Sequence, residues 1–199
     1  MTRVAGAHDP GDHRANDCIG EEDAQDEGGV ISRWTTHLAG QDTVEIGQRL
    51  PPHSPECAGC GPENPAGLHL RVVRTETGVE AVHSFSDVQV GAPGMAHGGA
   101  VALAFDDLFG FALYTVGSLA VTRSLTVDYQ APFRLHHPYT FHAHVAEREG
   151  RRLLLHADAW DDTGRKTGSA VATFVVVGPR HFVASTEPSP GKSDCRPST

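Results

Sequence analysis

Asp106 and Asp107 stand together in a stretch, His97 to Gly117, that opens with His-Gly-Gly and is otherwise almost wholly apolar. The stretch is long enough for about five turns of helix. A helix that is apolar on every side is normally enclosed by other structure or embedded in lipid, and charges at bilayer depth are costly. The pattern therefore predicts the central helix of a soluble domain, in which two aspartates are buried for a reason.

The start of this helix predicts a site for negative charge. Gly98 and Gly99 leave backbone N–H groups unobstructed, and the helix dipole adds partial positive charge, so this end could bind a phosphate or an oxyanion. Asp106 follows Gly99 by seven residues, which returns it to nearly the same face but roughly 10 Å along the axis. If the two groups cooperate, the carboxylate must come from a second, antiparallel copy of the helix in a two-fold dimer.

The residues alone leave a structural alternative open. A buried aspartate more often serves an ion pair or a backbone cap than catalysis, and Arg123 could be the partner of Asp106. Asp107 lies about 100° further round the helix and is a candidate for an ordinary salt bridge.

A Cys-x-x-Cys pair, Cys57 and Cys60, lies in a loop rich in proline and glycine from Pro51 to Gly67. Thiolate and imidazole ligands at such spacing bind zinc, with His53 or His69 completing the set. A second Cys-x-x-Cys pair is missing, so a tight turn with two reduced thiols is favoured and no metal is expected.

A second polar group arises from a predicted hairpin in which Arg148 pairs with Arg152 across three residues. This register gives one wholly apolar face, on which Phe141, Ala143 and Val145 lie opposite Ala159, Ala157 and Leu155. The other face collects His142, His144, His156 and Asp158. It should face solvent, so a polar outer face is favoured over a metal site.

Alternating apolar residues and turn residues predict the remaining elements. The expected strands are Leu68 to Thr75, Val79 to Phe85, Leu119 to Ala131, Tyr139 to Arg148, Arg152 to Trp160 and Thr167 to Val177, with a loop from Val88 to Ala96. Together they predict an α+β fold, in which a curved antiparallel sheet of about six strands wraps one long central helix.

The chain divides into one domain, residues 51–178, with appendages. Residues 1–29 are acidic and predicted to be disordered, 30–50 form a poorly defined extension, and 179–199 form a flexible tail. The 25 acidic side chains against 16 basic ones disfavour nucleic acid or an anionic membrane as partner. The N-terminus has no basic start followed by an apolar run, which favours a cytoplasmic location.

Three motifs together resemble the hotdog-fold thioesterases, most closely the PaaI-like branch, over roughly residues 50–178. The motifs are CxxCGxxNPxGLxL at Cys57 to Leu70, PGxxHGG at Pro93 to Gly99 with Asp106 nine residues after the histidine, and TxxLTVDYxxP at Thr122 to Pro132. The resemblance implies hydrolysis of an acyl-CoA or acyl-carrier thioester by a homodimer or a dimer of dimers. No cofactor is implied, since coenzyme A is part of the substrate.

The resemblance also assigns roles to residues. The amide of Gly98 or Gly99 would polarise the thioester carbonyl, and Asp106 of the partner subunit would act as general base or nucleophile. Thr122, or less favourably Ser124, would orient the water. His97 would shape the turn by hydrogen bonding.

One departure keeps other functions open. Many relatives carry Asn or Gln six or seven residues before the histidine, where this chain has Gly91 and Val90, so Gln89 is the remaining amide for substrate binding. Phe109 and its aromatic neighbours could line an acyl pocket, although such a stripe is more often core. The alternatives are a noncatalytic acyl-CoA or acyl-carrier binding protein, and a hotdog dehydratase or hydratase, whose HxPxxPxxPG entry motif is absent.

Overall fold

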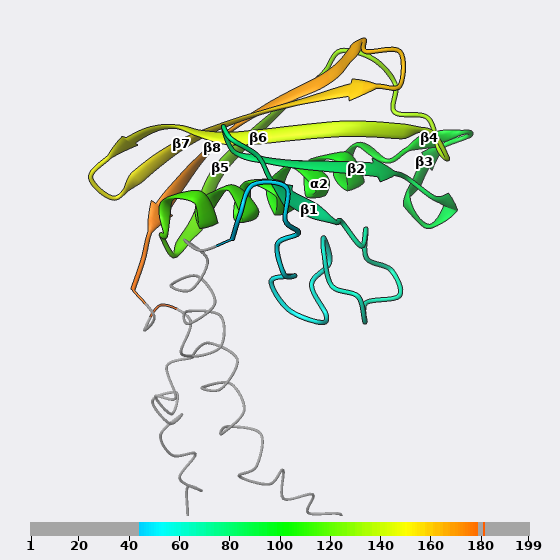
Figure 1. The fold of residues 1–199 in the computed structure, drawn as a ribbon. Helices are drawn as coiled ribbons and strands as arrows, with labels where there is room; N and C mark the ends of the chain where they lie inside the picture. The colour runs from blue at the N-terminus through cyan, green and yellow to red at the C-terminus, as the bar shows by residue number, and fades with distance from the viewer. Residues whose placement is uncertain (1–43, 179–180, 182–199) are drawn as a thin grey trace, which may run out of the picture.

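A curved antiparallel sheet lies over one long helix in the computed structural model, which describes residues 44–178 and His181 (Figure 1). The strands, in their order across the sheet, are β1 (Val72–Arg74), β2 (Val79–Ser84), β6 (Pro138–Glu149), β7 (Arg152–Asp161), β8 (Lys166–Val176) and β5 (Ala120–Tyr129). The predicted α+β fold is confirmed. The expectations for residues 1–29, for 30–43 of the extension and for nearly all of the tail lie outside the described residues.

Helix α2 (Gly98–Ala112) continues as the 3-10 helix η3 (Leu113–Val116) and ends at Gly117, whose φ of 57° is left-handed. The sheet covers one side of α2, and residues 44–70, named here the N-terminal segment, lie on the opposite side (Figure 1). By length and composition this helix could cross a membrane, but Phe105 and Leu108 are fully buried within the domain. Its apolar surface is therefore explained by enclosure in the core.

The first strand is shorter than predicted, because the backbone before it pairs within the N-terminal segment. Only Val72–Arg74 of the expected strand joins the sheet. The N–H groups of Leu68 and Leu70 donate instead to the carbonyl oxygens of Ala58 and Gly59, at 3.0 Å each. The backbone before β1 is thus used to fasten the Cys-x-x-Cys loop.

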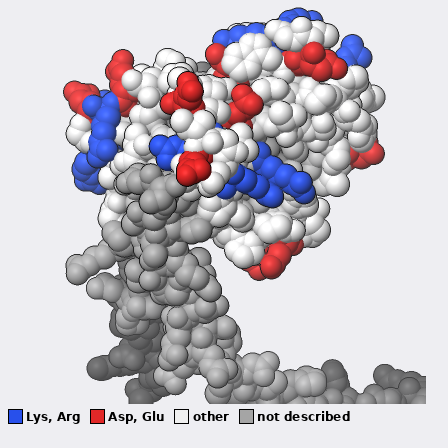
Figure 2. Space-filling model, in the orientation of Figure 1, with Lys and Arg blue, Asp and Glu red and all other residues white. Residues whose placement is uncertain are grey.

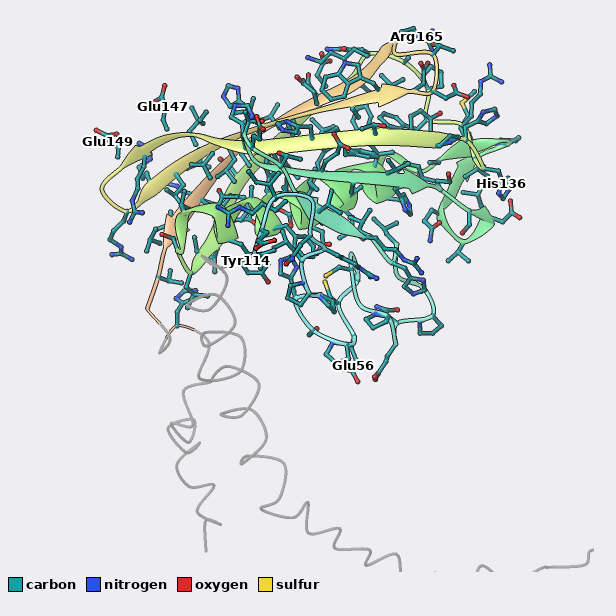
Figure 3. All side chains as sticks on the ribbon, in the orientation of Figure 1. Glu56, Tyr114, His136, Glu147, Glu149 and Arg165 are labelled. Atoms are coloured by element: carbon teal, nitrogen blue, oxygen red, sulfur yellow. The ribbon has the colours of Figure 1, made fainter. Side chains whose placement is uncertain are left out.

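The β6 and β7 hairpin keeps most of the predicted register. Phe141, Ala143 and Val145 lie opposite Ala159, Ala157 and Leu155, as expected, and His142 and His144 lie opposite Asp158 and His156. The predicted pairing of Arg148 with Arg152 is wrong. A bulge after Val145 shifts the end by one residue, so that Glu149 pairs with Arg152, and Gly150 turns the chain with a φ of 56°. Figure 3 shows Glu147 and Glu149 at this outer end of the hairpin.

The predicted loop from Val88 to Ala96 contains more structure than expected. It holds part of the 3-10 helix η2 (Asp87–Gln89) and a two-stranded sheet of β3 (Val90–Ala92) and β4 (Met95–Ala96). Gly94, with a φ of 74°, makes the turn between them. This small hairpin delivers the chain to the start of α2.

Acidic and basic side chains are interspersed on the face shown in Figure 2. The histidines of the β6 and β7 outer face form ring contacts, with centroids of His142 and His144 5.9 Å apart and those of His144 and His156 6.0 Å apart. Among the described residues, these side chains do not converge closely enough to hold a metal ion.

His83 on β2 predicts an acid-sensitive fold. Burial, with the charge of His69, lowers the pKa of His83 to about 4, against 6.5 for an exposed histidine. As pH falls below 6.5, His83 takes up a proton in the unfolded chain but stays neutral in the folded chain. The free energy of unfolding should therefore decrease by up to about 3 kcal/mol by pH 4. Urea unfolding across this range should show a shallower decrease for His83→Gln. The exposed His137→Gln variant should keep the native slope, and equal slopes for all three proteins would contradict the assignment.

Candidate active site

His97 caps helix α2 and distinguishes the two glycines. The N–H of Gly99 donates to His97 Nδ1 at 2.9 Å, which confirms that the histidine shapes the turn. The N–H of Gly98 has no acceptor among the described residues. Tyr129, at the end of β5, donates its hydroxyl to the Gly98 carbonyl at 2.7 Å. Of the two glycines, Gly98 therefore offers the free donor.

Asp106 is half-buried and accepts a hydrogen bond from Thr122 Oγ1 at 2.9 Å on its Oδ1. A bulge at Arg123 separates Thr122 from Ser124 in strand β5. Within the described part of the chain, neither Ser124 nor Arg123 contacts the carboxylate. The structure thus pairs Asp106 with Thr122, and not with Arg123, the ion-pair partner considered in the structural alternative.

A cavity of about 280 Å³ opens beside this pair, between α2, η3 and β5. Its polar lining includes Asp106 and Thr122, and its apolar lining is formed by Leu113, Leu119, Ala120, Val121 and Phe174. Phe109 is not part of it. That side chain is fully buried, with its ring centroid 6.2 Å from that of Phe174, so the expected pocket residue is a core residue.

The expected amide before the helix is held elsewhere. Gln89 Oε1 accepts from the backbone N–H of Ser86 at 2.9 Å and from its hydroxyl at 2.8 Å, which caps η2. Gly91 packs so closely on the helix start that a Cβ there would lie 2.5 Å from the Cα of His97. The close packing of this hairpin on the helix start thus leaves no room at position 91 for the Asn or Gln side chain that many relatives carry.

Gly98 and Asp106 cannot meet within one chain. They are eight residues apart on a continuous helix, which separates them by about 12 Å. Strand β5 contacts both groups, Asp106 through Thr122 near its start and Gly98 through Tyr129 at its end. The two halves of the candidate site therefore lie at opposite ends of one edge strand.

Asp107 points away from this pair, into a second polar cluster. Its Oδ1 lies 3.0 Å from His53 Nδ1 and 3.2 Å from Cys57 Sγ. Burial opposes a charge on His53, but its contacts with Asp107 and Cys57 outweigh burial and raise its pKa to about 9. A hydrogen bond from Cys60 is the main cause that lowers the pKa of Cys57 to about 3. Burial raises the pKa of Asp107, so the Cys57 thiolate is the favoured negative charge beside His53.

Two glycines make room for this cluster. A Cβ on Gly59 would lie 2.2 Å from Asp107 Cγ, and one on Gly110 would lie 2.8 Å from His53 Cε1. The sequence alone assigned no partner to Asp107. The glycine between the cysteines, and the glycine three residues after Asp107, were the signals available for this close approach.

The Gly59→Ala variant should be less stable than the native protein by about 1–3 kcal/mol, because the added methyl group would overpack a buried carboxylate. Urea unfolding measures this difference. Gly178→Ala is the matched control, since a Cβ there meets no atom within 4 Å. Equal stability of the two variants would show that the loop can move away from the helix at no cost.

Residues 93–167, from the small hairpin through the start of β8, match the family model of the thioesterase superfamily. This part of the chain is similar to members of that superfamily. No curated protein gives a significant match.

Solved structures share the hotdog fold at low sequence identity. A thioesterase superfamily protein is 21% identical with a TM-score of 0.58, and the match covers 81% of this chain and 80% of that one. A hypothetical thioesterase from Streptococcus pneumoniae, solved with coenzyme A, is 20% identical with a TM-score of 0.52, over 55% of this chain and 86% of that one. PaaI from the phenylacetic acid degradation operon of E. coli is 16% identical with a TM-score of 0.52, over 56% and 81%. The likeness to the PaaI-like branch is one of fold.

Two variants of the Streptococcus pneumoniae protein were also solved, one with an aspartate and one with a threonine replaced by alanine. Those two positions are 16 residues apart in that chain, the same separation as between Asp106 and Thr122 here.

Proposed function

We propose that this protein, of which residues 93–167 match the thioesterase superfamily, hydrolyses an acyl-CoA or acyl-carrier thioester to the free acid and the thiol. The observation that carries the proposal is the hydrogen bond from Thr122 to Asp106 at the wall of a largely apolar cavity. Thr122 occupies one oxygen of the carboxylate and thereby orients the other, which can accept a proton from water. The apolar walls suit an acyl group.

The reaction follows from these two groups and the helix start. Asp106 takes a proton from water as the oxygen attacks the thioester carbonyl carbon, and the carbonyl oxygen gains the negative charge. The Gly98 N–H, with the helix dipole behind it, stabilises that oxyanion. The intermediate then expels the thiolate, which takes up the proton, and the acid is released. Attack by the carboxylate itself, followed by hydrolysis of the anhydride, uses the same groups.

A homodimer supplies both groups to one substrate. Strand β5 is ten residues long and forms one edge of the sheet. Leu125 and Val127 are half-buried and Tyr129 is 47% exposed. A long edge strand with exposed apolar side chains is normally covered by another chain or element. Antiparallel pairing of two β5 strands about a two-fold axis near Leu125 exchanges the ends of the strand. It would bring Thr122 and Asp106 of one subunit to Tyr129 and Gly98 of the other.

Coenzyme A is the favoured thiol because structural neighbours were solved with coenzyme A and acetyl-CoA. Its phosphates need a basic side chain near the site entrance. Arg134 is exposed and forms a β-bridge with Met95, two residues before His97. It is the arginine we assign to phosphate binding.

A noncatalytic acyl-CoA binding protein is the second candidate, supported by Val90 and Gly91 at the positions where many relatives carry Asn or Gln. Thiol release from a panel of short, medium, branched and aromatic acyl-CoAs, measured with a thiol reagent, separates the two functions. Steady turnover with at least one ester supports hydrolysis. Saturable binding of CoA esters without thiol release would replace it with the binding function.

A further inference from the structure

His53, Cys57, Cys60 and Asp107 form a compact four-residue cluster outside the thioesterase machinery. Three of them come from the N-terminal segment and Asp107 comes from α2. Each offers one ligand atom, and all four atoms lie within 4.8 Å of one another. Figure 3 shows this segment on the side of α2 away from the sheet, with Glu56 at its outer tip.

The distances within the cluster resemble the edges of a tetrahedral metal site. Asp107 Oδ1 lies 3.0 Å from His53 Nδ1 and 3.2 Å from Cys57 Sγ, and Cys60 Sγ lies 3.3 Å from His53 Nδ1. A tetrahedral zinc ion, with bonds of about 2.0–2.3 Å, holds neighbouring ligand atoms about 3.3–3.8 Å apart. Shifts of a few tenths of an ångström would therefore admit the ion.

The surroundings favour a buried cation over a polar contact among protein groups alone. The side chains of His53 and Asp107 are 15% and 5% exposed, and Asp107 Oδ2 is buried with no hydrogen-bond partner among the described residues. The backbone N–H of His53 donates to Cys60 Sγ at 3.2 Å, a contact that stabilises a thiolate. A hydrogen bond joins Cys57 Sγ and Asp107 Oδ1, and a cation bound by both atoms would replace the proton between them.

We propose that His53, Cys57, Cys60 and Asp107 bind one structural Zn²⁺ ion. Two thiolates, an imidazole and a carboxylate form a closed set of four protein ligands, which is the arrangement of structural rather than catalytic zinc. The sequence favoured a metal-free turn because it showed only two cysteines and an undecided histidine. The fold supplies the other two ligands, and it excludes His69, whose Nε2 lies 2.6 Å from the Asn64 carbonyl oxygen.

The ion would link the N-terminal segment to the central helix. Asp107 follows Asp106 directly, so fixing one carboxylate on the outer side of α2 fixes the rotation that directs the other toward Thr122. The cavity beside Asp106 is also lined by His53 and Asp107, so two of the proposed ligands form part of its wall. Zinc would thus position the helix without taking part in the reaction.

Metal analysis of the full chain, purified with a reducing agent and incubated with Zn²⁺ before desalting, tests the proposal directly. About one zinc per chain is expected for the native protein and for His69→Asn, whose position has a left-handed φ of 53° that asparagine tolerates. Cys57→Ser and Cys60→Ser should each lose most of the zinc. Retention by both cysteine variants, or loss equal to theirs in His69→Asn, would overturn the assigned ligands.

Measurements on the native protein cover the case in which the cysteine variants do not fold. Chelation should lower the melting temperature, and Zn²⁺ should restore it. Replacement by Co²⁺ should give thiolate charge-transfer bands and the intense visible bands of a tetrahedral site. Reduced native protein that takes up neither ion would overturn the proposal, while leaving thiol release, and so the proposed reaction, unaffected.

Discussion

Replacing Asp106 with asparagine should lower kcat for thioester hydrolysis by about 100- to 10,000-fold, the range that a positioned general base contributes. Asparagine keeps the shape and can still accept the Thr122 hydrogen bond, but it cannot take a proton from water. KM should change little, because the substrate contacts remain. Thiol release at saturating substrate measures the effect, alongside circular dichroism to check the fold.

Thr122→Val provides the comparison for this variant. It removes one hydrogen bond to a charged group, for which about 1.5–3 kcal/mol, or roughly a 10- to 100-fold loss in kcat, is expected. The loss should therefore be smaller than that of Asp106→Asn. Native kcat in Asp106→Asn would exclude this carboxylate from the reaction, and a larger loss in Thr122→Val would transfer the central role to the hydroxyl.

Replacing Gly98 with proline should lower kcat by about 100- to 1,000-fold, because it deletes the single N–H assigned to the oxyanion. Proline is well tolerated at the first position of a helix, and His97, with φ −64° and ψ 134°, already has the backbone conformation favoured before proline. Gly98→Ala is the matched control. It keeps the N–H, and the nearest atom to its Cβ would be the Tyr129 hydroxyl oxygen at 3.5 Å, an ordinary contact, so activity should stay near native. Equal kcat values for the two variants would remove Gly98 from the oxyanion site.

Mixing the two inactive variants tests whether the site is shared. In a mixed dimer of Gly98→Pro and Asp106→Asn subunits, one site receives both lesions and the other receives none. Random exchange of subunits should therefore recover about a quarter of the native activity. No recovery, with subunit exchange verified by mass, would place both groups of a working site in one chain.

The sequence by itself predicted the central helix, most of the strands and the residues of the candidate active site. Apolar alternation located the strands of the sheet, and the solid apolar run located α2, because side-chain periodicity is a local property of strands and helices. The separation of Gly98 and Asp106 along one helix also followed from local geometry. The sequence did not predict the bulge after Val145 or the hairpin at Gly91, because both depend on packing that periodicity does not encode.

Only the tertiary structure decided which groups meet. His97 occupies the N–H of Gly99 and so leaves Gly98 as the donor, a choice between neighbours that a motif cannot make. Asp107 meets Cys57 and His53 from 50 and 54 residues away, and these two residues lie in a loop without regular periodicity. Ligands brought together by loop closure and by two close glycine contacts leave only weak marks in the sequence, whereas a helix and its capping residues are encoded side by side.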